Sequence, residues 1–423
     1  MKKTNLTKSL ALGFACASSL MFSACSQSDN PATPNQPDQP IVVVPSVPGI
    51  PSDDSATPNP ELLPEELNAV LPNFSYSVDK ENGWLVVRFD MTGIQDPNSP
   101  GEWVRLYGPG DSRQDVWLSV DGKPKGFSIY NTIDESKQEQ APVDLVFLVD
   151  NSTSMSEEAN AIYRDILEWS AQLSKTLDVR FACVGYGGFV SGAINLTTAD
   201  ELKKYLEEKS WLSSCDGIWR TRGFVGEDAE ILEAAANDPN YRVVGTSYRY
   251  TAWSAPDASE CGVMALRYAN DHFKFRSGAN RVYVNLTDER NQPGSKTELF
   301  STQWVKDNWT PTQGTIHTVY TQSSSWVNRW ENNVGINYPW DLSVYTGGTM
   351  LFTNSTFRDS SDKEVKLSDL PVSAALMNSY VIKFTNVEEL FDGQEHLVKI
   401  TVKSVGENGA VLAEKEFIVV FSI

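Results

Sequence analysis

Three oxygen-bearing side chains follow one apolar segment of the sequence at alternate positions. The stretch DLVFLVDNSTSMSEE covers residues 144–158, and in it Asp150, Ser152 and Ser154 are spaced i, i+2 and i+4. A curved loop can turn oxygens with this spacing toward one point. Carboxylate and hydroxyl oxygens are hard ligands, which suit Mg²⁺, Mn²⁺ or Ca²⁺ better than zinc or copper. An alternative interpretation is that a serine caps the next helix and Asp150 complements the helix dipole.

A second apolar segment also ends at a carboxylate. In RVYVNLTDER, residues 281–290, a strand-like run leads to Asp288. Adjacent parallel strands that end in Asp150 and Asp288 would place both acids at one edge of a sheet, where they repel each other. A cation between them removes that repulsion. The alternative for Asp288 is an ordinary helix cap or turn residue, but the two segments together favour a cation site.

The elements that must position these side chains alternate between strand and helix. The apolar run at residues 143–149 is typical of a strand buried on both faces, and the next segment has apolar residues at helical spacing. This alternation predicts an α/β fold with a doubly wound, mostly parallel sheet, whose ligands bind at the carboxyl ends of the strands. We expect further strands at 179–187, 281–288, 314–321 and 340–355, and helices at 156–178, 198–209, 258–273 and 295–307.

The flanking segments 73–140 and 356–423 are predicted to be β-rich. Each contains short apolar runs separated by turn residues, such as Asp121-Gly122, which favours a hairpin. Neither segment alone is long enough to bury the core of a sandwich. We therefore predict that both together form an all-β sandwich, into which residues 141–355 are inserted.

Residues 141–355 resemble a von Willebrand factor A domain. Asp150-Asn151-Ser152-Thr153-Ser154 matches the Asp-x-Ser-x-Ser of its metal-ion-dependent adhesion site, and Asp288 in NLTDE matches the aspartate of the family's fourth strand. The resemblance covers about half of the chain. It implies a bound divalent cation, Mg²⁺ first and Mn²⁺ or Ca²⁺ as alternatives. It also implies one open coordination position that an acidic group of a partner fills.

The family's site has a further ligand between these two motifs. PDASECGVMAL, residues 256–266, resembles the I-like domain of integrin β subunits, where an Asp-x-x-Glu precedes the helix. That resemblance assigns Glu260 as the metal ligand and Asp257 to a second cation site. Ser259 stands where integrins have proline.

Two other residues are alternatives for this ligand. Thr251 is closer to the common threonine pattern, and Asp228 lies in VGEDAEIL. Thr349 in TGGTM is rejected, because it follows Asp288 in the sequence and fits the sixth strand.

The N-terminus is predicted to be an export signal. Residues 1–24 combine a basic start with a short apolar run, and FSAC resembles a bacterial lipobox that makes Cys25 the lipidated mature N-terminus. Ser26 resembles the outer-membrane sorting pattern, so we expect an anchor in the bacterial outer membrane, on its periplasmic face or at the cell surface. Residues 25–72 are expected to be a disordered tether, since 11 of the chain's 22 prolines lie in residues 26–72. The alternative is an ordinary secretory signal.

Charge and composition limit the function classes. The net charge of −20 becomes −23 once the signal with its three lysines is removed, and such a chain repels nucleic acids. The sequence has no Gly-x-Ser-x-Gly elbow, Walker loop or Cys-x-x-Cys, and its three histidines lie far apart, so we do not expect an enzyme. A serine hydrolase that uses Ser152 or Ser154 is the lesser alternative, because it would need a base.

The expected partner is a protein or glycan that carries an acidic group. The alternative is a structural assembly module of a cell-envelope complex with a ligand-silent metal site. A long insertion at about 211–256 is rich in aromatic and arginine residues, which interfaces use for specificity. A Cys215–Cys261 bridge is conceivable in an oxidising compartment, and Cys183 is expected to be buried.

Overall fold

The computed structural model describes most of the chain from residue 48 onward. The described ranges are 48–132 without 100, 142–207 without 157 and 189, the strand backbones 241–244 and 250–253, 260–321, and 337–422 without 360. Cys25 with its signal, Cys215, Asp228 and Asp257 lie outside them, and Thr251 is described by its backbone alone. Within these ranges no helix combines the length and apolarity needed to cross a bilayer.

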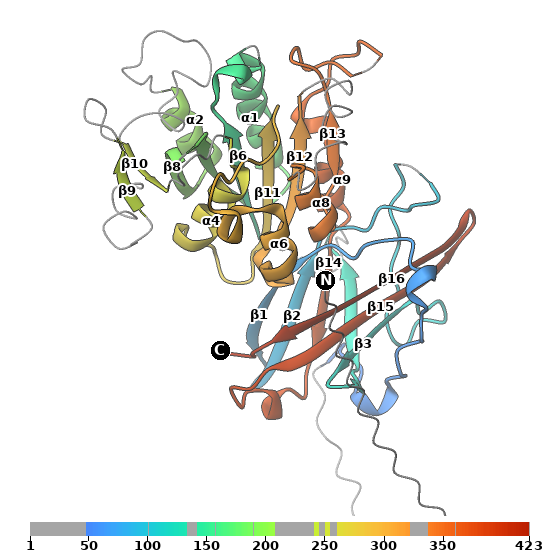
Figure 1. Cartoon of the computed structure of the whole chain (residues 1–423). Helices are drawn as coiled ribbons and strands as arrows, with labels where there is room; N and C mark the ends of the chain where they lie inside the picture. The colour runs from blue at the N-terminus through green and yellow to red at the C-terminus, as the bar shows by residue number, and fades with distance from the viewer. Residues whose placement is uncertain are drawn as a thin grey trace, which may run out of the picture. The chain divides into compact units, whose positions relative to one another are not determined.

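A six-stranded sheet positions the predicted site (Figure 1). All neighbouring strands pair in parallel except β7 and β8, which are antiparallel. The predicted fold class, a mostly parallel α/β sheet combined with an all-β sandwich, is confirmed. In sheet order the strands are β13 (Met350–Phe352), β12 (Thr315–Tyr320), β11 (Asn280–Thr287), β6 (Val143–Asp150), β7 (Val179–Tyr186) and β8 (Val190–Thr197).

Helices cover both faces of this sheet. Every residue of β6 is buried, because its alternate side chains enter two cores. Phe147 packs with Trp169 of α1, and Leu148 belongs to the core that contains α4. One face carries α1 (Ala159–Leu173) and α2 (Ala199–Glu207), and the other carries α4 (Gly262–His272), α5 (Thr297–Phe300), α6 (Thr302–Asn308) and α8 (Asp341–Thr346).

Both β-rich segments contribute strands to one sandwich. Its antiparallel sheets have the orders β1-β2-β14-β5 and β16-β15-β3-β4, and one apolar core joins them. Asp121, at φ 52°, and Gly122, at φ 74°, turn the β3–β4 hairpin. The strands are β1 (Phe74–Glu81), β2 (Trp84–Met91), β3 (Val116–Val120), β4 (Lys123–Pro124), β5 (Phe127–Asn131), β14 (Tyr380–Phe384), β15 (His396–Gly406) and β16 (Gly409–Val419).

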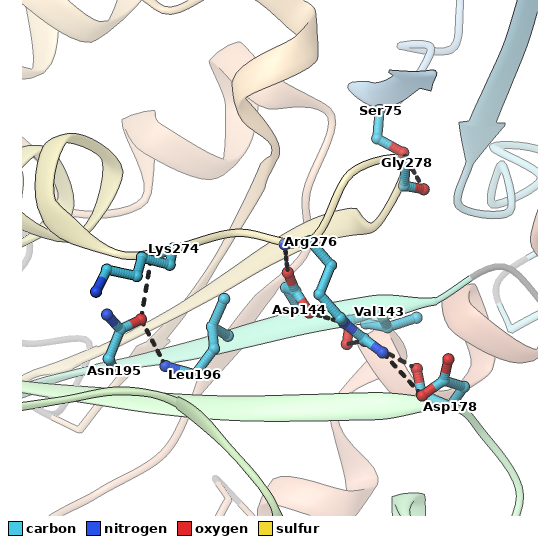
Figure 2. Close-up of polar contacts among 9 residues, drawn as sticks. All are labelled: Ser75, Val143, Asp144, Asp178, Asn195, Leu196, Lys274, Arg276 and Gly278. Atoms are coloured by element: carbon cyan, nitrogen blue, oxygen red, sulfur yellow. Dashed lines mark hydrogen bonds and ion pairs between the residues drawn. The ribbon is translucent and has the colours of Figure 1, made fainter. Parts of the chain in front are cut away.

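Arg276 links the amino-terminal ends of β6 and β7, while the predicted site follows the carboxyl ends of β6 and β11. Figure 2 shows the contacts of this arginine. Arg276 donates from Nε to Asp144 Oδ1 at 2.7 Å and from Nη1 to Asp178 Oδ1 at 2.8 Å, and its backbone N–H donates to Asp144 Oδ2 at 2.7 Å. Burial raises the pKa of Asp144 in spite of this arginine. Ser75 of β1 donates to the carbonyl of Gly278 at 3.3 Å in the same region.

Three segments differ from the sequence predictions in secondary structure. Residues 340–355, expected as one strand, form α8 and then the short β13. The helix ends because Gly347 adopts φ 73°, a left-handed conformation that suits glycine at a helix C-terminus. Strand β8 was not predicted. It is the last described strand of the sheet and pairs with β7 through an irregular register.

Residues 356–379 also differ from the expected β-rich segment. They include the 3₁₀ turn Leu367–Asp369 and α9 (Pro371–Met377), with Pro371 at the first helical position. Their apolar side chains pack on the α1 face of the six-stranded sheet rather than in the sandwich.

Part of the expected tether is packed on the sandwich. Within residues 48–72, Leu71 is buried in the sandwich core, and the backbone N–H groups of Asn68 and Ala69 both donate to the carbonyl of Leu412. Proline content suppresses regular secondary structure there, but it does not prevent this pairing with an edge strand.

Candidate metal centre

The loop after β6 is shaped by its own first carboxylate. Asp150 Oδ1 accepts a hydrogen bond from the backbone N–H of Ser152 at 2.9 Å, which is an Asx turn. The N–H of Asn151 donates to the carbonyl of Tyr186 at 2.7 Å and fixes the loop to β7. The 3₁₀ turn Thr153–Ser156 then leads into α1. The aspartate is fully buried, Ser152 is half-buried and Ser154 is exposed, so the loop presents hydroxyl groups outward from a buried base.

The two predicted motifs meet at one edge of the sheet. Leu286 of β11 lies opposite Val149 of β6, so Asp288 follows β11 at the level just beyond Asp150. Ser154 Oγ donates to Asp288 Oδ1 at 3.1 Å, and the Ser152 and Ser154 hydroxyl oxygens are 2.9 Å apart. The parallel register therefore brings together the four side chains predicted from the motifs.

Glu260 lies beside the same loop. Its carboxylate is hydrogen-bonded by the Ser152 hydroxyl, and Gln292 Nε2 donates to its Oε2 at 2.7 Å. The backbone N–H of Gln292 also donates to the carbonyl of Glu260 at 2.8 Å, and the N–H of Cys261 donates to the carbonyl of Gly187 at 3.1 Å. The two backbone bonds fix the start of α4 to Gln292 and to the end of β7, and the Ser152 bond connects Glu260 to the loop after β6. The competing residues Thr251, Asp228 and Asp257 have no described side chains, so Glu260 is the one member of this group that the structure places in the site.

Burial and mutual repulsion perturb the carboxyl groups. Burial, with smaller contributions from Glu260 and Asp288, raises the pKa of Asp150 to about 8. Burial, followed by the charges of Glu289 and Asp288, raises the pKa of Glu260 to about 7. The charges that act on these two groups are thus other carboxylates. A divalent cation would reverse both shifts, because it stabilises the ionised form of every neighbouring acid.

The donor set fits a hard cation only if the hydroxyl groups take part. In the described part of the chain, no three His, Cys, Asp or Glu side chains are grouped closely enough to hold a metal by themselves. Ser152 and Ser154 supply the missing oxygens between Glu260 and Asp288. Hydroxyl and carboxylate oxygens are ligands for Mg²⁺, Mn²⁺ or Ca²⁺.

Two residues that sequence reasoning missed orient carboxylates of the site. Thr287 Oγ1 donates to Asp150 Oδ2 at 2.7 Å, and Gln292 holds Glu260 as described above. Thr287 could have been found, because it directly precedes Asp288 at the end of the same strand. Gln292 gives no comparable signal, since it lies in a loop 32 residues from its partner.

The described cysteines are free thiols. Cys183 and Cys261 are both buried, and burial raises the pKa of the Cys261 thiol to about 12. The suggested partner of Cys261, Cys215, lies outside the described residues. The Cys261 thiol lies 3.4 Å from Asn291 Oδ1 at the start of α4.

Three solved structures illustrate what this chain is similar to. No protein-family model and no curated protein sequence matches it. Proximal thread matrix protein 1 from the mussel byssus, with a zinc-occupied MIDAS motif, gives a TM-score of 0.34 at 10% identity over 60% of this chain and 49% of that one. BatB from Bacteroides thetaiotaomicron gives a TM-score of 0.27 at 12% identity, over 50% of this chain and 90% of that one. Manganese-loaded TRAP from Plasmodium vivax gives a TM-score of 0.26 at 12% identity, over 69% of this chain and 95% of that one.

The chain spans about half the length of the mussel protein. All three TM-scores are below 0.5, so the fold and the site rest on the strand order, register and contacts given above.

Proposed function

We propose that this chain carries a von Willebrand factor A-type domain that binds a divalent cation and, through it, an acidic group of a partner. One observation carries the proposal. The hydroxyl groups of Ser152 and Ser154 lie between the carboxylates of Glu260 and Asp288, at the carboxyl ends of two adjacent parallel strands.

The residues divide into ligands and supports. Ser152, Ser154 and Glu260 are the proposed direct ligands, while Asp150 and Asp288 act from the buried side of the loop. A bound cation supplies Lewis acidity toward one further oxygen ligand. Ser154 is exposed, so a partner's carboxylate can approach from solvent. Mg²⁺ is the expected ion, with Mn²⁺ and Ca²⁺ as alternatives.

The proposed setting is the bacterial cell envelope. Cys25 would carry the lipid, and the domain would face the periplasm or the cell surface. The partner would be a protein or glycan with an acidic group, and not a nucleic acid, because of the chain's net negative charge.

We do not propose an enzyme. The described histidines contact residues other than the loop serines: His317 bonds to Thr349, His396 bonds to Asp121 and Asp392, and the His272 ring lies 5.1 Å from the Tyr268 ring. A hydrolase that uses Ser152 or Ser154 would still react with a fluorophosphonate probe, and labelling at either serine would replace the adhesion proposal.

The metal test measures thermal unfolding of the full chain during titration with Mg²⁺ or Mn²⁺. We expect the ion to raise the midpoint by mass action, and Ser152→Ala with Ser154→Ala to remove the shift. Asp200→Asn, at an exposed acid of α2, is the matched control and should keep it. Equal midpoints with and without metal in the unmodified chain would contradict the proposal.

The partner test is capture from envelope extracts in Mg²⁺ and again in EDTA. Metal-dependent adhesion predicts that partners are lost on chelation and recovered when Mg²⁺ is restored. Partners retained in EDTA would support the assembly role with a ligand-silent site instead.

A further inference from the structure

Buried polar side chains lie beneath the start of α4. On the α4 face of the six-stranded sheet the core is mainly apolar, but at the carboxyl ends of the strands it holds Asp150, Tyr186, Asn285 and Thr287. None of these four residues is more than 2% exposed. Buried polar groups cost free energy unless they bond to one another. Their hydrogen bonds therefore decide what this group of residues does.

The four side chains form one hydrogen-bonded chain. The Tyr186 hydroxyl donates to Asn285 Oδ1 at 2.8 Å, and it is also hydrogen-bonded with the Thr287 hydroxyl. Thr287 Oγ1 donates to Asp150 Oδ2 at 2.7 Å. Each bond joins residues of different strands or of one strand end, so the chain crosses β7, β11 and β6 in turn. A buried network whose members are bonded in this way is rigid.

Gly262, the first residue of α4, lies directly against this network. A Cβ at this position would lie 2.9 Å from Asn285 Oδ1 and 3.1 Å from the Tyr186 hydroxyl oxygen. Carbon atoms in good contact are about 3.5–4.0 Å from their neighbours, so a methyl group does not fit. The helix can begin this close to the sheet only because the residue has no side chain.

The start of α4 is held from other directions as well. The backbone N–H of Cys261 donates to the carbonyl of Gly187 at 3.1 Å, and that of Val263 donates to Asn291 Oδ1 at 3.0 Å. The helix start cannot move toward the sheet without a clash, and it cannot move away without breaking these bonds. Glu260 directly precedes it. The separation between Glu260 and the loop after β6 is therefore fixed by packing beneath the helix.

We propose that Tyr186 and Asn285, packed against Gly262, are positioning residues that hold Glu260 close to the loop after β6 and make the site select Mg²⁺ over Ca²⁺. The inference rests on the proposed function and deepens it by naming the residues that set the size of the ion. Mg²⁺ takes oxygen ligands at about 2.0–2.1 Å, and Ca²⁺ takes them at about 2.3–2.6 Å in more flexible sites. A site whose two sides cannot separate favours the smaller ion.

The test measures the affinity of the full chain for both ions. Mn²⁺ is bound first, its release is followed by water proton relaxation, and Mg²⁺ or Ca²⁺ is the competitor. We expect Mg²⁺ to bind the unmodified chain at least about 10-fold more tightly than Ca²⁺. Gly262→Ala should weaken Mg²⁺ binding about 10-fold, because the methyl group displaces the helix start, and Ca²⁺ binding less than about 2-fold. Tyr186→Phe should act in the same direction by loosening the network.

A second measurement needs no metal. In EDTA, hydrogen exchange of the backbone amides of residues 261–263 should become about 10-fold faster in both variants, because the helix start opens more often. Ala269→Gly is the control: it removes a buried methyl group from a later turn of α4 and weakens the helix without touching the network. It should leave the ratio of the Mg²⁺ and Ca²⁺ affinities unchanged. A purely structural role of Tyr186 would lower both affinities equally.

The outcomes separate this inference from the proposed function. If Mn²⁺ does not bind the unmodified chain, the proposed function itself is contradicted. If Mn²⁺ binds but the ratio of the Mg²⁺ and Ca²⁺ affinities is the same in the unmodified chain and in Tyr186→Phe, only the role of the positioning residues is overturned. Tyr186→Phe adds no atom, so it decides the question even if Gly262→Ala does not fold.

Discussion

Ser154 donates a hydrogen bond of 3.1 Å to Asp288, although 134 residues separate them in the sequence. Each residue follows a buried parallel strand, and the register between β6 and β11 places those strand ends side by side. The bond shows that the loop and the second aspartate face one small volume. The first three predictions below concern the charges in that volume.

The stability of the metal-free protein should fall as the pH rises from about 4 to about 8. The folded pKa of Asp150, about 8, is raised above its value in the unfolded chain, so the native state binds more protons in this window and loses stability with pH. Asp150→Asn removes the buried charge and should flatten the profile, with a gain on the order of 1–3 kcal/mol at pH 8. Urea unfolding in EDTA at several pH values measures this. A wild-type profile that rises across the window would contradict the burial argument.

Cation binding should release protons and weaken as the pH falls below about 7. The carboxyl groups of Asp150 and Glu260 have raised pKa values in the metal-free state, and the ion requires them ionised. Calorimetric titration with Mg²⁺ in two buffers of different ionisation enthalpy measures the protons released. A binding enthalpy that is independent of the buffer at pH 7 would exclude this coupling.

Glu260 should be the third protein ligand, held in place by Gln292. Glu260→Gln should weaken Mn²⁺ binding more than about 10-fold, and Gln292→Ala about 10-fold, because residues that orient a ligand affect affinity nearly as much as the ligand. Thr251→Val tests the alternative threonine, and Gln303→Ala, at an exposed residue of α6, is the matched control. Paramagnetic relaxation of water by bound Mn²⁺ gives the affinities. If Thr251→Val reduces the affinity and Glu260→Gln does not, the assignment is reversed.

Arg276→Ala should destabilise the protein by about 3–5 kcal/mol, because it leaves the carboxylate of Asp144 buried without its cation. Asp144→Asn in the same background should restore part of the loss by removing the charge. Chemical denaturation of the two variants measures both effects. Arg180→Ala, at an exposed residue of β7, should cost little.

His396 should contribute pH-dependent stability to the sandwich. Its ring nitrogens lie 2.8 Å from Asp121 and 3.1 Å from Asp392, and these carboxylates raise its pKa. Because the folded pKa is raised, the stabilisation is fully present below about pH 6.5 and is lost as the pH rises through the folded value. His396→Gln should therefore lower the free energy of unfolding more at about pH 5.5 than at about pH 8.5, which lie on either side of the ordinary histidine pKa. Equal losses at the two pH values would show that the ring acts by packing alone.

The sequence determined the elements that carry the site. The apolar run before Asp150 is buried at every residue of β6, as its composition indicates, and Ile162, Ile166 and Trp169 of α1 enter the core at helical spacing. Local sequence was less informative where an edge strand or a short helix depends on its neighbours. Among the described strands, β8 pairs with β7 alone, and α8 has six residues, too few for a clear period.

The tertiary structure decided which residues far apart in the sequence lie close together. The sequence indicates Asp150, Ser154 and Asp288 as candidate ligands, but it is the parallel register of β6 and β11 that brings their side chains together. Nothing local to Gln292 predicts its bond to Glu260, and nothing in the sequence around Gly262 predicts that Tyr186 and Asn285 lie against it. Periodicity and turn chemistry act over a few residues and can be read along the chain. Contacts between distant segments depend on how whole strands align, and so they are fixed only when the chain folds.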